Sequence, residues 1–265
     1  IEGGGRLLIP YFVWSMLYLM KDSLTNSEIT VKHIIYAFCT GKAATPFYYI
    51  VVMVQLTLLT PWLIKIKNRK WLYVVTSVYL VFLYGFNLYT GQMPRFYETF
   101  FPAWFIFYIF GMDCRAGKWD NSIKKVQKSW IIMALLISII EGFVLLETGC
   151  AIGFASSQIR FGSFLYSSVI ALVLMKYRDM GSKNSSLKKL TVSIGNCSYG
   201  IFYVHMLVLM IVRKALSMTW MSQTWILDFV ACFALTAVGS YLIVIGTKSL
   251  AKKLSIEKVL NLIGF

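Results

Sequence analysis

The chain has 265 residues, 58% of them hydrophobic and only 14% charged, and its formal net charge is +15. A soluble domain has about 25% charged residues, so this composition excludes an ordinary soluble protein and indicates a bundle of membrane helices. Lys and Arg lie in short loops between apolar runs, a pattern that orients membrane helices and argues against a nucleic acid partner. The five Cys are scattered without a CxxC pair, which supports neither a metal site nor a disulfide framework.

The apolar runs predict an all-α fold with eight membrane-spanning helices, because a helix needs about 20 apolar residues to cross a bilayer. We expect these helices near residues 7–23, 45–64, 71–90, 98–113, 129–147, 160–176, 192–213 and 227–247. The apolar segment 31–41 is too short to span and is expected to be interfacial or re-entrant. The loops are too short for a second domain, so residues 1–265 are interpreted as a single transmembrane domain.

The distribution of Lys and Arg favours one topology. With both termini in the cytoplasm, the inner segments hold 19 of these residues and the outer segments hold 7. Every inner loop is also richer in positive charge than the outer loops beside it. Because positive charge stays on the cytoplasmic side, eight spans with both ends inside is the expected arrangement of a multi-pass inner (plasma) membrane protein.

His205 lies in the stretch SYGIFYVHMLV (198–208), which contains no other charged side chain. Ionisable groups inside a membrane are costly and mark functional sites. Glu141 lies about 18 Å from the inner face and His205 about 22 Å, so the two are candidates for a catalytic pair. The alternatives are a structural His205 bonded to a backbone carbonyl or to a Ser or Tyr of a neighbouring helix, and a Glu141 that reaches the outer interface beside Glu147.

The stretch YTGQMPRFYETFFPAWFIFYIFGM (89–112) is expected to form the outer mouth of the fourth span. Arg95 and Glu98 lie three residues apart and are expected to be neighbours at the end of a helix. Most of the nine aromatic residues between 96 and 110 are expected to form a lipid-facing belt. The alternative for Trp104 is that it stacks on a sugar, so Arg95, Glu98 and Trp104 are the candidate substrate-binding residues.

Two polar residues of the first two spans have ordinary interpretations. Gln55 lies in the middle of its span and is expected to make an interhelical hydrogen bond. Arg6 lies at the inner end of the first span. The ordinary interpretation is that its long side chain reaches the membrane–water interface and anchors the helix there. The alternative for Arg6 is a contact with a phosphate, because the planar fork of guanidinium donors matches phosphate geometry.

Four stretches are informative in combination. They are RLLIPYFVWSMLY (6–18), FYYIVVMVQLTLLTPWL (47–63), PAWFIFYIFGM (102–112) and SIGNCSYGIFYVHMLVLMIV (193–212). The last is the most specific, a small-Tyr-Gly-Ile-Phe/Tyr-x-x-His segment in a late helix. In order and spacing the four resemble the membrane acyltransferase family 3 over essentially the whole chain. The resemblance implies a bacterial enzyme that O-acylates a cell-envelope or exported carbohydrate, usually with acetyl-CoA.

The chain departs from the family pattern at its start. The family begins with a helix that carries an Arg and a His, followed by a second helix, and this chain resembles a member that lacks these first two helices. Arg6 matches the second Arg of the family's R-x-x-R pair, and Gly3 stands at the first position. The resemblance implies that acetyl-CoA or another acyl-CoA docks from the cytoplasmic side near Arg6, and that His205 positions groups or relays a proton. No metal is expected, because the Cys and His residues form no cluster.

Three functions are compared. The first is an acyltransferase, with the lipid bilayer, acyl-CoA and a carbohydrate acceptor as partners. The second is a transporter for a polysaccharide or a lipid-linked sugar, which suits eight helices with many aromatic residues. Transporters often show repeats and broken helices at matching positions in two halves, and the absence of such symmetry here favours the first function. The third is a non-catalytic remnant of an acyltransferase.

The charge distribution yields a topology prediction. Reporter fusions after Lys70 and Lys128 are expected to report the cytoplasm, and fusions after Arg95 and Gly153 the outside, because Lys and Arg concentrate in the first pair of loops. A phosphatase reporter and a fluorescent reporter at each site give opposite signals and control for expression. Two reversed sites among the four contradict the eight-span topology.

Overall fold

The protein is all-helical, as the sequence predicts. The computed structural model describes residues 2–25, 30–177, 186–220 and 224–265, and these residues form helices and no strands. The chain packs into two compact units, which are residues 1–50 with 182–265 (unit 1) and residues 51–181 (unit 2). The single domain expected for residues 1–265 stays a prediction.

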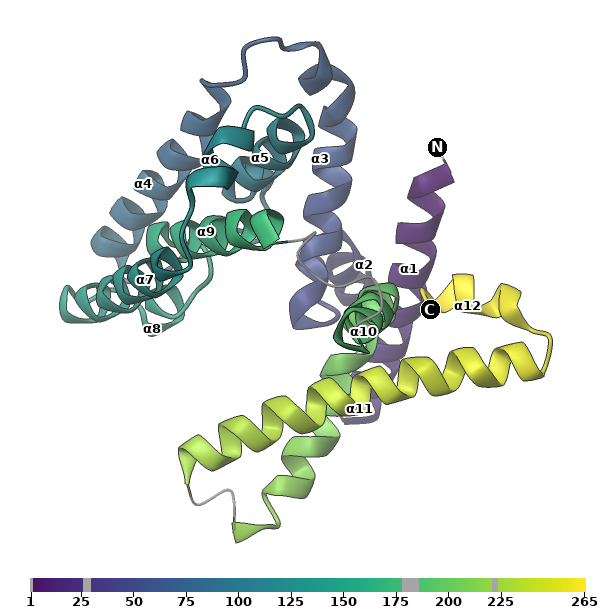
Figure 1. Ribbon diagram of the computed structural model, residues 1–265. Helices are drawn as coiled ribbons and strands as arrows, with labels where there is room; N and C mark the ends of the chain where they lie inside the picture. The colour runs from purple at the N-terminus through teal and green to yellow at the C-terminus, as the bar shows by residue number, and fades with distance from the viewer. Residues whose placement is uncertain (1, 26–29, 178–185, 221–223) are drawn as a thin grey trace. The chain divides into compact units, whose positions relative to one another are not determined.

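Figure 1 shows the helices of both units. Those of unit 1 are α1 (Glu2–Thr25), α2 (Val31–Thr40), η1 (Thr45–Phe47), the start of α3 (Tyr48–Lys65), α10 (Ser186–Leu216), α11 (Trp225–Lys253) and α12 (Glu257–Ile263). Those of unit 2 are the rest of α3, α4 (Leu72–Thr90), η2 (Phe101–Ala103), α5 (Phe105–Arg115), α6 (Asp120–Lys125), α7 (Ser129–Glu147), α8 (Ile152–Ala155) and α9 (Phe161–Tyr177).

Within the described ranges, five helices are long and apolar enough to cross a membrane. They are Thr45–Lys65, Leu72–Thr90, Ser129–Glu147, Lys188–Leu216 and Trp225–Lys253, and Phe161–Tyr177 is a shorter apolar helix. The five correspond to the predicted second, third, fifth, seventh and eighth spans, so the polytopic helical class is confirmed. The count of eight spans and the cytoplasmic location of both termini stay predictions. The short segment 31–41 is a helix, α2, and its interfacial location also stays a prediction.

The predicted fourth span, residues 98–113, is wrong as a continuous helix. The chain before residue 101 is irregular, η2 has three residues and α5 has only 11. Pro102 explains the break, because proline lacks an N–H and is tolerated in the first turn of a helix but not in its interior. An irregular backbone of this kind is tolerated at membrane depth only where the protein itself supplies hydrogen-bond partners.

Side chains of α3 and α4 supply these partners. The amide group of Gln55 donates to the carbonyl of Thr99 at 2.9 Å, and its oxygen accepts the N–H of Phe101 at 3.0 Å. The hydroxyl of Thr76 donates to the carbonyl of Pro102 at 2.9 Å and accepts an N–H from the first turn of α5 at 3.0 Å. The hydrogen bonds of Gln55 therefore go to the backbone of the irregular segment. The predicted hydrogen bond from Gln55 to another membrane helix is wrong.

The aromatic residues between 96 and 110 are not mainly a lipid-facing belt. Of the nine, only Phe96 and Phe100 are exposed, and the others are partly or fully buried. The prediction assumed a straight helix, whereas after the break several of these rings pack against other parts of unit 2. Phe107, for example, meets Phe164 of α9 edge-on with 5.0 Å between ring centroids.

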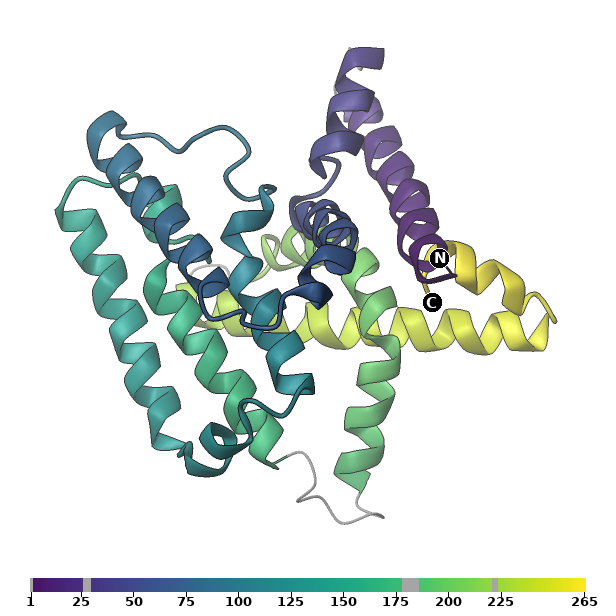
Figure 2. The same cartoon turned by 90° about the horizontal axis from the view of Figure 1, so that it is seen from above.

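The core of unit 1 is a cluster of aromatic side chains between α1 and α10. The rings of Trp14 and Tyr203 stack with centroids 6.0 Å apart, and Phe47 meets Tyr203 edge-on at 5.6 Å. The hydroxyl of Tyr18 donates to the carbonyl of Tyr203 at 2.9 Å. The indole of Trp14 donates to the carbonyl of Ile263 at 2.9 Å, which fastens the end of α12 to α1, so the C-terminus lies beside the start of α1 in Figure 2.

α10 and α11 cross in close contact at Gly200. A Cβ atom at Gly200 would lie 3.0 Å from both methyl groups of Val244 and 2.9 Å from the ring of Phe265. Gly239 makes a second close approach, where a Cβ atom would lie 3.1 Å from Val208. Small residues at such crossings let the backbones of two membrane helices approach closely. Close packing matters in lipid, because the hydrophobic effect does not drive helices together there.

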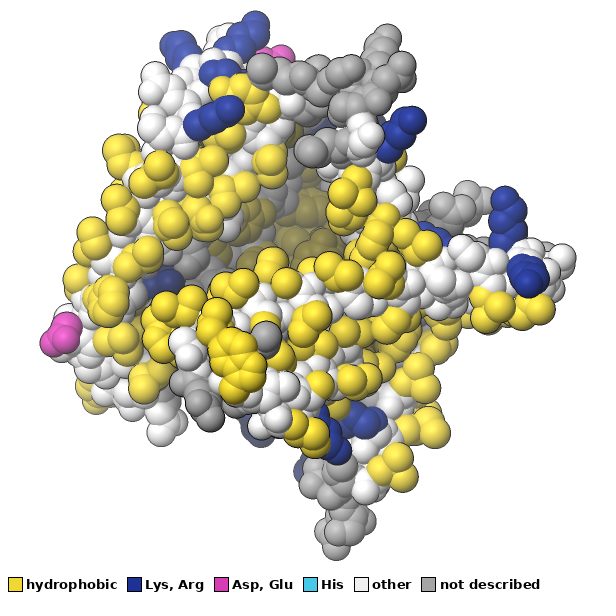
Figure 3. All heavy atoms as spheres, turned by 60° about the horizontal axis from the view of Figure 1, so that its bottom comes forward, with side chains coloured by type: hydrophobic (Ala, Val, Ile, Leu, Met, Phe, Trp, Pro, Cys, Tyr) yellow, Lys and Arg dark blue, Asp and Glu magenta, His cyan; other side chains and the backbone are white. Residues whose placement is uncertain are grey.

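Figure 3 shows apolar side chains over much of the visible face, with Lys and Arg mainly at its margins. Large apolar side chains of the candidate spans are open to the surroundings, for example Val81 at 73% exposure, Phe143 at 65% and Phe233 at 69%. So much exposed apolar surface on several helices suits contact with lipid chains.

The crossing at Gly200 yields a stability prediction. Gly200→Ala is expected to lower the free energy of unfolding by about 1–3 kcal/mol, because the new methyl group overpacks the contact with Val244. Gly195→Ala in the same helix is the matched control, since a Cβ atom there has no neighbour within 4 Å. Thermal unfolding in detergent measures both, and equal midpoints for the two variants contradict the close crossing.

Candidate active site

A pocket of 440 Å³ lies between α10 and α11 and contains His205. It is lined by Ile201, His205, Leu209, Arg213, Asp228, Phe229, Cys232, Phe233, Thr236 and Ala237. The four residues from α10 recur every four positions, so they share one face of the helix. Arg213 and Asp228 lie near the loop that joins the two helices, and the remaining wall is mostly apolar.

His205 has one ring nitrogen held by the backbone. Its Nδ1 lies 3.1 Å from the carbonyl oxygen of Ile201, one turn earlier in α10. Because a carbonyl oxygen only accepts, this contact requires the proton on Nδ1, and Nε2 of the neutral ring is then an acceptor. Among the described residues no hydrogen bond reaches Nε2. The ring therefore combines a fixed orientation with an acceptor nitrogen that is open to another molecule.

The hydroxyl of Thr236 lines the same pocket. Its Oγ1 is buried and has no hydrogen-bond partner in the described part of the chain. Leaving a buried polar group unsatisfied costs about 1–3 kcal/mol, so such groups are normally bonded to something. An open ring nitrogen and an unsatisfied hydroxyl in one apolar pocket are the features expected where a ligand with a polar group binds.

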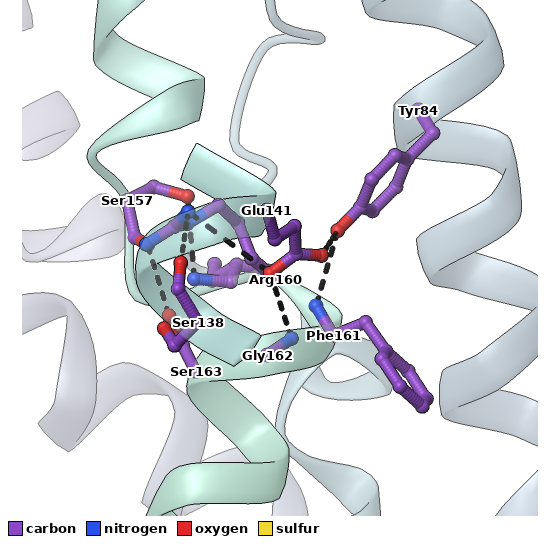
Figure 4. Close-up of polar contacts among 9 residues, drawn as sticks. Tyr84, Ser138, Glu141, Ser157, Arg160, Phe161, Gly162 and Ser163 are labelled. Carbon is purple, nitrogen blue, oxygen red and sulfur yellow. Dashed lines mark hydrogen bonds and ion pairs between the residues drawn. The ribbon is translucent and has the colours of Figure 1, made fainter. Parts of the chain in front are cut away.

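Glu141 lies in a second polar cluster, within unit 2, shown in Figure 4. The hydroxyl of Tyr84 donates to its Oε1, the N–H of Gly162 donates to its Oε2 at 2.7 Å, and Arg160 approaches Oε2 at 4.0 Å. The side chains of Glu141 and Arg160 are only 17% and 10% exposed. Arg160 also donates to the carbonyls of Ser138 and Ser157, at 3.3 and 2.9 Å.

This cluster completes the start of α9. The first N–H groups of a helix have no partner within the helix, and a negative charge at that end is favourable. Glu141 accepts the N–H of Gly162, and the hydroxyl of Tyr84 accepts the N–H of Phe161 at 3.1 Å. A Cβ atom at Gly162 would lie 2.6 Å from Glu141 Oε2, so the absence of a side chain there allows the bond. The contacts of Glu141 therefore have a structural purpose that the sequence did not indicate.

The two residues of the predicted catalytic pair belong to different units: His205 lies in unit 1 and Glu141 in unit 2. Each has its own partners within its unit, and their pairing stays a prediction. The sequence analysis missed Arg160 as a partner of Glu141, although an Arg directly before an apolar run was the available signal. Arg6 belongs to α1, and its side chain lies outside the described part of the structure.

The candidate substrate-binding residues lie in the irregular segment before α5. Trp104 donates its indole N–H to the carbonyl of Glu98 at 2.8 Å, and the carboxylate of Glu98 accepts from Tyr97 at 2.8 Å. Arg95 is exposed and lies over the ring of Phe96 at 5.7 Å. The structure thus brings Glu98 and Trp104 together, whereas the expected helix end at Arg95 and Glu98 is wrong because this segment is not helical.

The described residues contain no group of three or more His, Cys, Asp and Glu side chains that could hold a metal ion. The apolar helices and the polar sites among them define a multi-pass membrane protein. A family model described as an acyltransferase domain, that of acyltransferase family 3, matches residues 3–245. The chain therefore belongs to acyltransferase family 3 and is a membrane acyltransferase. A search of curated proteins and a search of solved structures each found no match.

The buried contacts of Glu141 yield a second stability prediction. Glu141→Gln leaves Arg160 without its carboxylate partner and is expected to lower the free energy of unfolding by about 3 kcal/mol. Glu147→Gln is the matched control, because Glu147 is exposed at the end of the same helix, α7. The midpoint of thermal unfolding in detergent measures both. A Glu141→Gln protein as stable as the control contradicts the role of this carboxylate in holding Arg160 and α9.

Proposed function

We propose that the protein is an O-acyltransferase of the bacterial inner membrane. It transfers an acyl group, with acetyl as the first candidate, from acyl-CoA to a hydroxyl of a cell-envelope or exported carbohydrate. The observation that carries the proposal is the family match over residues 3–245. The apolar helices support a location in the bilayer, and the family supports the use of an acyl donor.

The reaction needs a base near the acceptor hydroxyl. The hydroxyl oxygen attacks the thioester carbonyl and forms the ester bond, the C–S bond breaks, and the proton of the hydroxyl ends on the sulfur of CoA. A group that takes this proton in the transition state and returns it to the leaving thiolate contributes about 10²–10⁴-fold to the rate. Nε2 of His205 suits this task, because the bond from Nδ1 to Ile201 leaves it as an acceptor.

The pocket around His205 can receive a hydroxyl of a carbohydrate acceptor. Its lining is mostly apolar, and a site from which water is displaced on binding strengthens the polar contacts inside. Asp228 and Arg213 offer polar groups at the end of the pocket. This arrangement supports His205 as a residue that touches the acceptor.

The other predicted site residues enter the proposal with narrower roles. Arg6 is proposed to meet the phosphates of the acyl donor, because its guanidinium group matches phosphate geometry. Arg95, Glu98 and Trp104 are proposed to contact the carbohydrate, in which the indole ring would stack on a sugar. Glu141 is proposed to act through Arg160 and the start of α9, which it fixes in place.

Acyl transfer by membranes that carry the intact protein tests this proposal. With radiolabelled acetyl-CoA, label is expected in the carbohydrate fraction. His205→Gln keeps hydrogen-bonding capacity but cannot take a proton, and it is expected to lower the turnover about 100-fold.

The matched control is His33→Gln, which makes the same change at the other histidine of the chain, an exposed residue of α2. It is expected to leave the rate unchanged. Thermal unfolding confirms that the variants fold. A folded His205→Gln protein with the unmodified rate overturns the role of His205, and label that enters only lipid or protein overturns the carbohydrate acceptor.

A further inference from the structure

A second pocket between α10 and α11 lies at the other ends of these helices and is basic. It has a volume of 600 Å³. It is lined by Lys188, Lys189, Val192, Ser193, Asn196, Cys197, Ile245, Lys248 and Ser249. The three lysines come from the start of α10 and the end of α11, the ends that the charge distribution assigns to the cytoplasmic side.

The close crossing at Gly200 builds this basic pocket. Val244 packs against Gly200, so the next turn of α11 brings Lys248 beside the preceding turn of α10. There Nζ of Lys248 donates to the carbonyl of Asn196 at 2.9 Å and lies 3.8 Å from the sulfur of Cys197. The ammonium group is therefore held at the wall by groups that orient it without neutralising its charge.

Three lysines bring positive charge to the basic pocket, and no carboxylate stands among its described lining residues. Like charges at close range repel one another, and the repulsion is relieved when an anion binds among them. Ser193, Asn196 and Ser249 add polar groups that can bond an anion's oxygens, and a cluster of ammonium and hydroxyl donors is a common means of binding phosphate.

A basic pocket in unit 2 provides a contrast. It is lined in part by Lys67, Lys70 and Lys118, but it also contains Asp113, which accepts hydrogen bonds from Lys118 at 2.9 Å and from Tyr73 at 3.0 Å. Burial acts to raise the pKa of Asp113, but the bonds from Lys118, Tyr73 and Arg69 outweigh it and hold the pKa below its usual value. Asp113 is thus an internal counter-ion of the pocket in unit 2, whereas the described lining of the pocket at Lys248 contains no carboxylate.

We propose that the pocket of Lys188, Lys189 and Lys248 binds a phosphate group. Two sources carry this chemistry on the cytoplasmic side, the phosphates of a CoA thioester and the headgroup of an anionic phospholipid. The CoA source rests on the proposed function, and the lipid source is independent of it. Val192 and Ile245 give the pocket an apolar wall that either a nucleotide ring or lipid chains can contact.

Binding measurements on the purified intact protein test the proposal. Lys248→Gln is compared with Lys252→Gln, which removes the same charge one turn later in α11, where the side chain is exposed and outside the pocket lining. The probes are coenzyme A, measured by titration calorimetry, and phosphatidylglycerol or phosphatidylcholine, measured by the shift of the unfolding midpoint. Lys248→Gln is expected to weaken binding of one phosphate probe about tenfold, the size expected for one charge-assisted bond, and Lys252→Gln is expected to leave it unchanged.

The outcome also identifies the source of the phosphate. Weaker binding of coenzyme A, with the lipid shift unchanged, assigns the pocket to the acyl donor. Loss of the phosphatidylglycerol shift, with coenzyme A binding unchanged, assigns it to lipid, and this result stands even if the protein transfers no acyl group. Equal effects of Lys248→Gln and Lys252→Gln, or no effect of Lys248→Gln on either probe, overturn the proposal.

A double variant guards against a local defect at Lys248. Lys188→Gln with Lys189→Gln removes the other two charges without touching the bond from Lys248 to Asn196. Its control is Lys124→Gln with Lys125→Gln, two exposed lysines of α6 in the other unit. The first pair is expected to weaken the same probe as Lys248→Gln, and the control pair is not. If both pairs act alike, only the overall charge matters and the pocket is not a site.

Discussion

The structure of unit 2 depends on one constraint, that a backbone N–H or C=O group away from water must find its partner within the protein. A continuous helix meets this constraint by itself, but unit 2 has breaks around η2 and α8 and before α9. Polar side chains on the apolar helices α3, α4 and α7 meet it there. Gln55 and Thr76 bond the backbone around η2, Asn87 bonds Gln92 and the N–H before α8, and Tyr84 and Glu141 bond the start of α9. The irregular chain and the polar side chains are thus two parts of one arrangement.

The sequence predicted the helices well where an apolar run is long and uninterrupted, since hydropathy measures the free energy of burying a whole segment in lipid. It failed between 98 and 113 because Pro102 interrupts a run that is apolar throughout, and hydropathy does not distinguish a helix from an irregular chain. The partners that make the break possible come from residues tens of positions away. Thr76 and Asn87 lie 11 residues apart on α4, three turns along one face, and this spacing of polar residues in an apolar helix was the signal available.

For the candidate active site, the sequence identified the residue but not its surroundings. A histidine in an apolar run is rare enough that His205 could be selected without a structure. Its pocket depends on which face of α11 packs against α10, and that register is set by Gly200 and Gly239 together with the partners they meet. Thr236 and Asp228 could not be chosen from the sequence, because a hydroxyl or carboxylate on α11 lines the pocket only in this register. The family match assigns the class of reaction, and the pocket supplies the chemistry on which the proposed role of His205 rests.

The paired bonds of Gln55 have a consequence for how the protein enters its membrane. Two unbonded backbone groups at Thr99 and Phe101 would each cost several kcal/mol in lipid, so the segment around η2 is a poor candidate for insertion on its own. Gln55 is made 44 residues before Thr99, and α3 can therefore already be in place when the irregular segment leaves the ribosome. We therefore expect α3, α4 and α5 to enter the bilayer as one assembled group. In that group the amide of Gln55 bonds the backbone groups that water would otherwise bond outside the lipid.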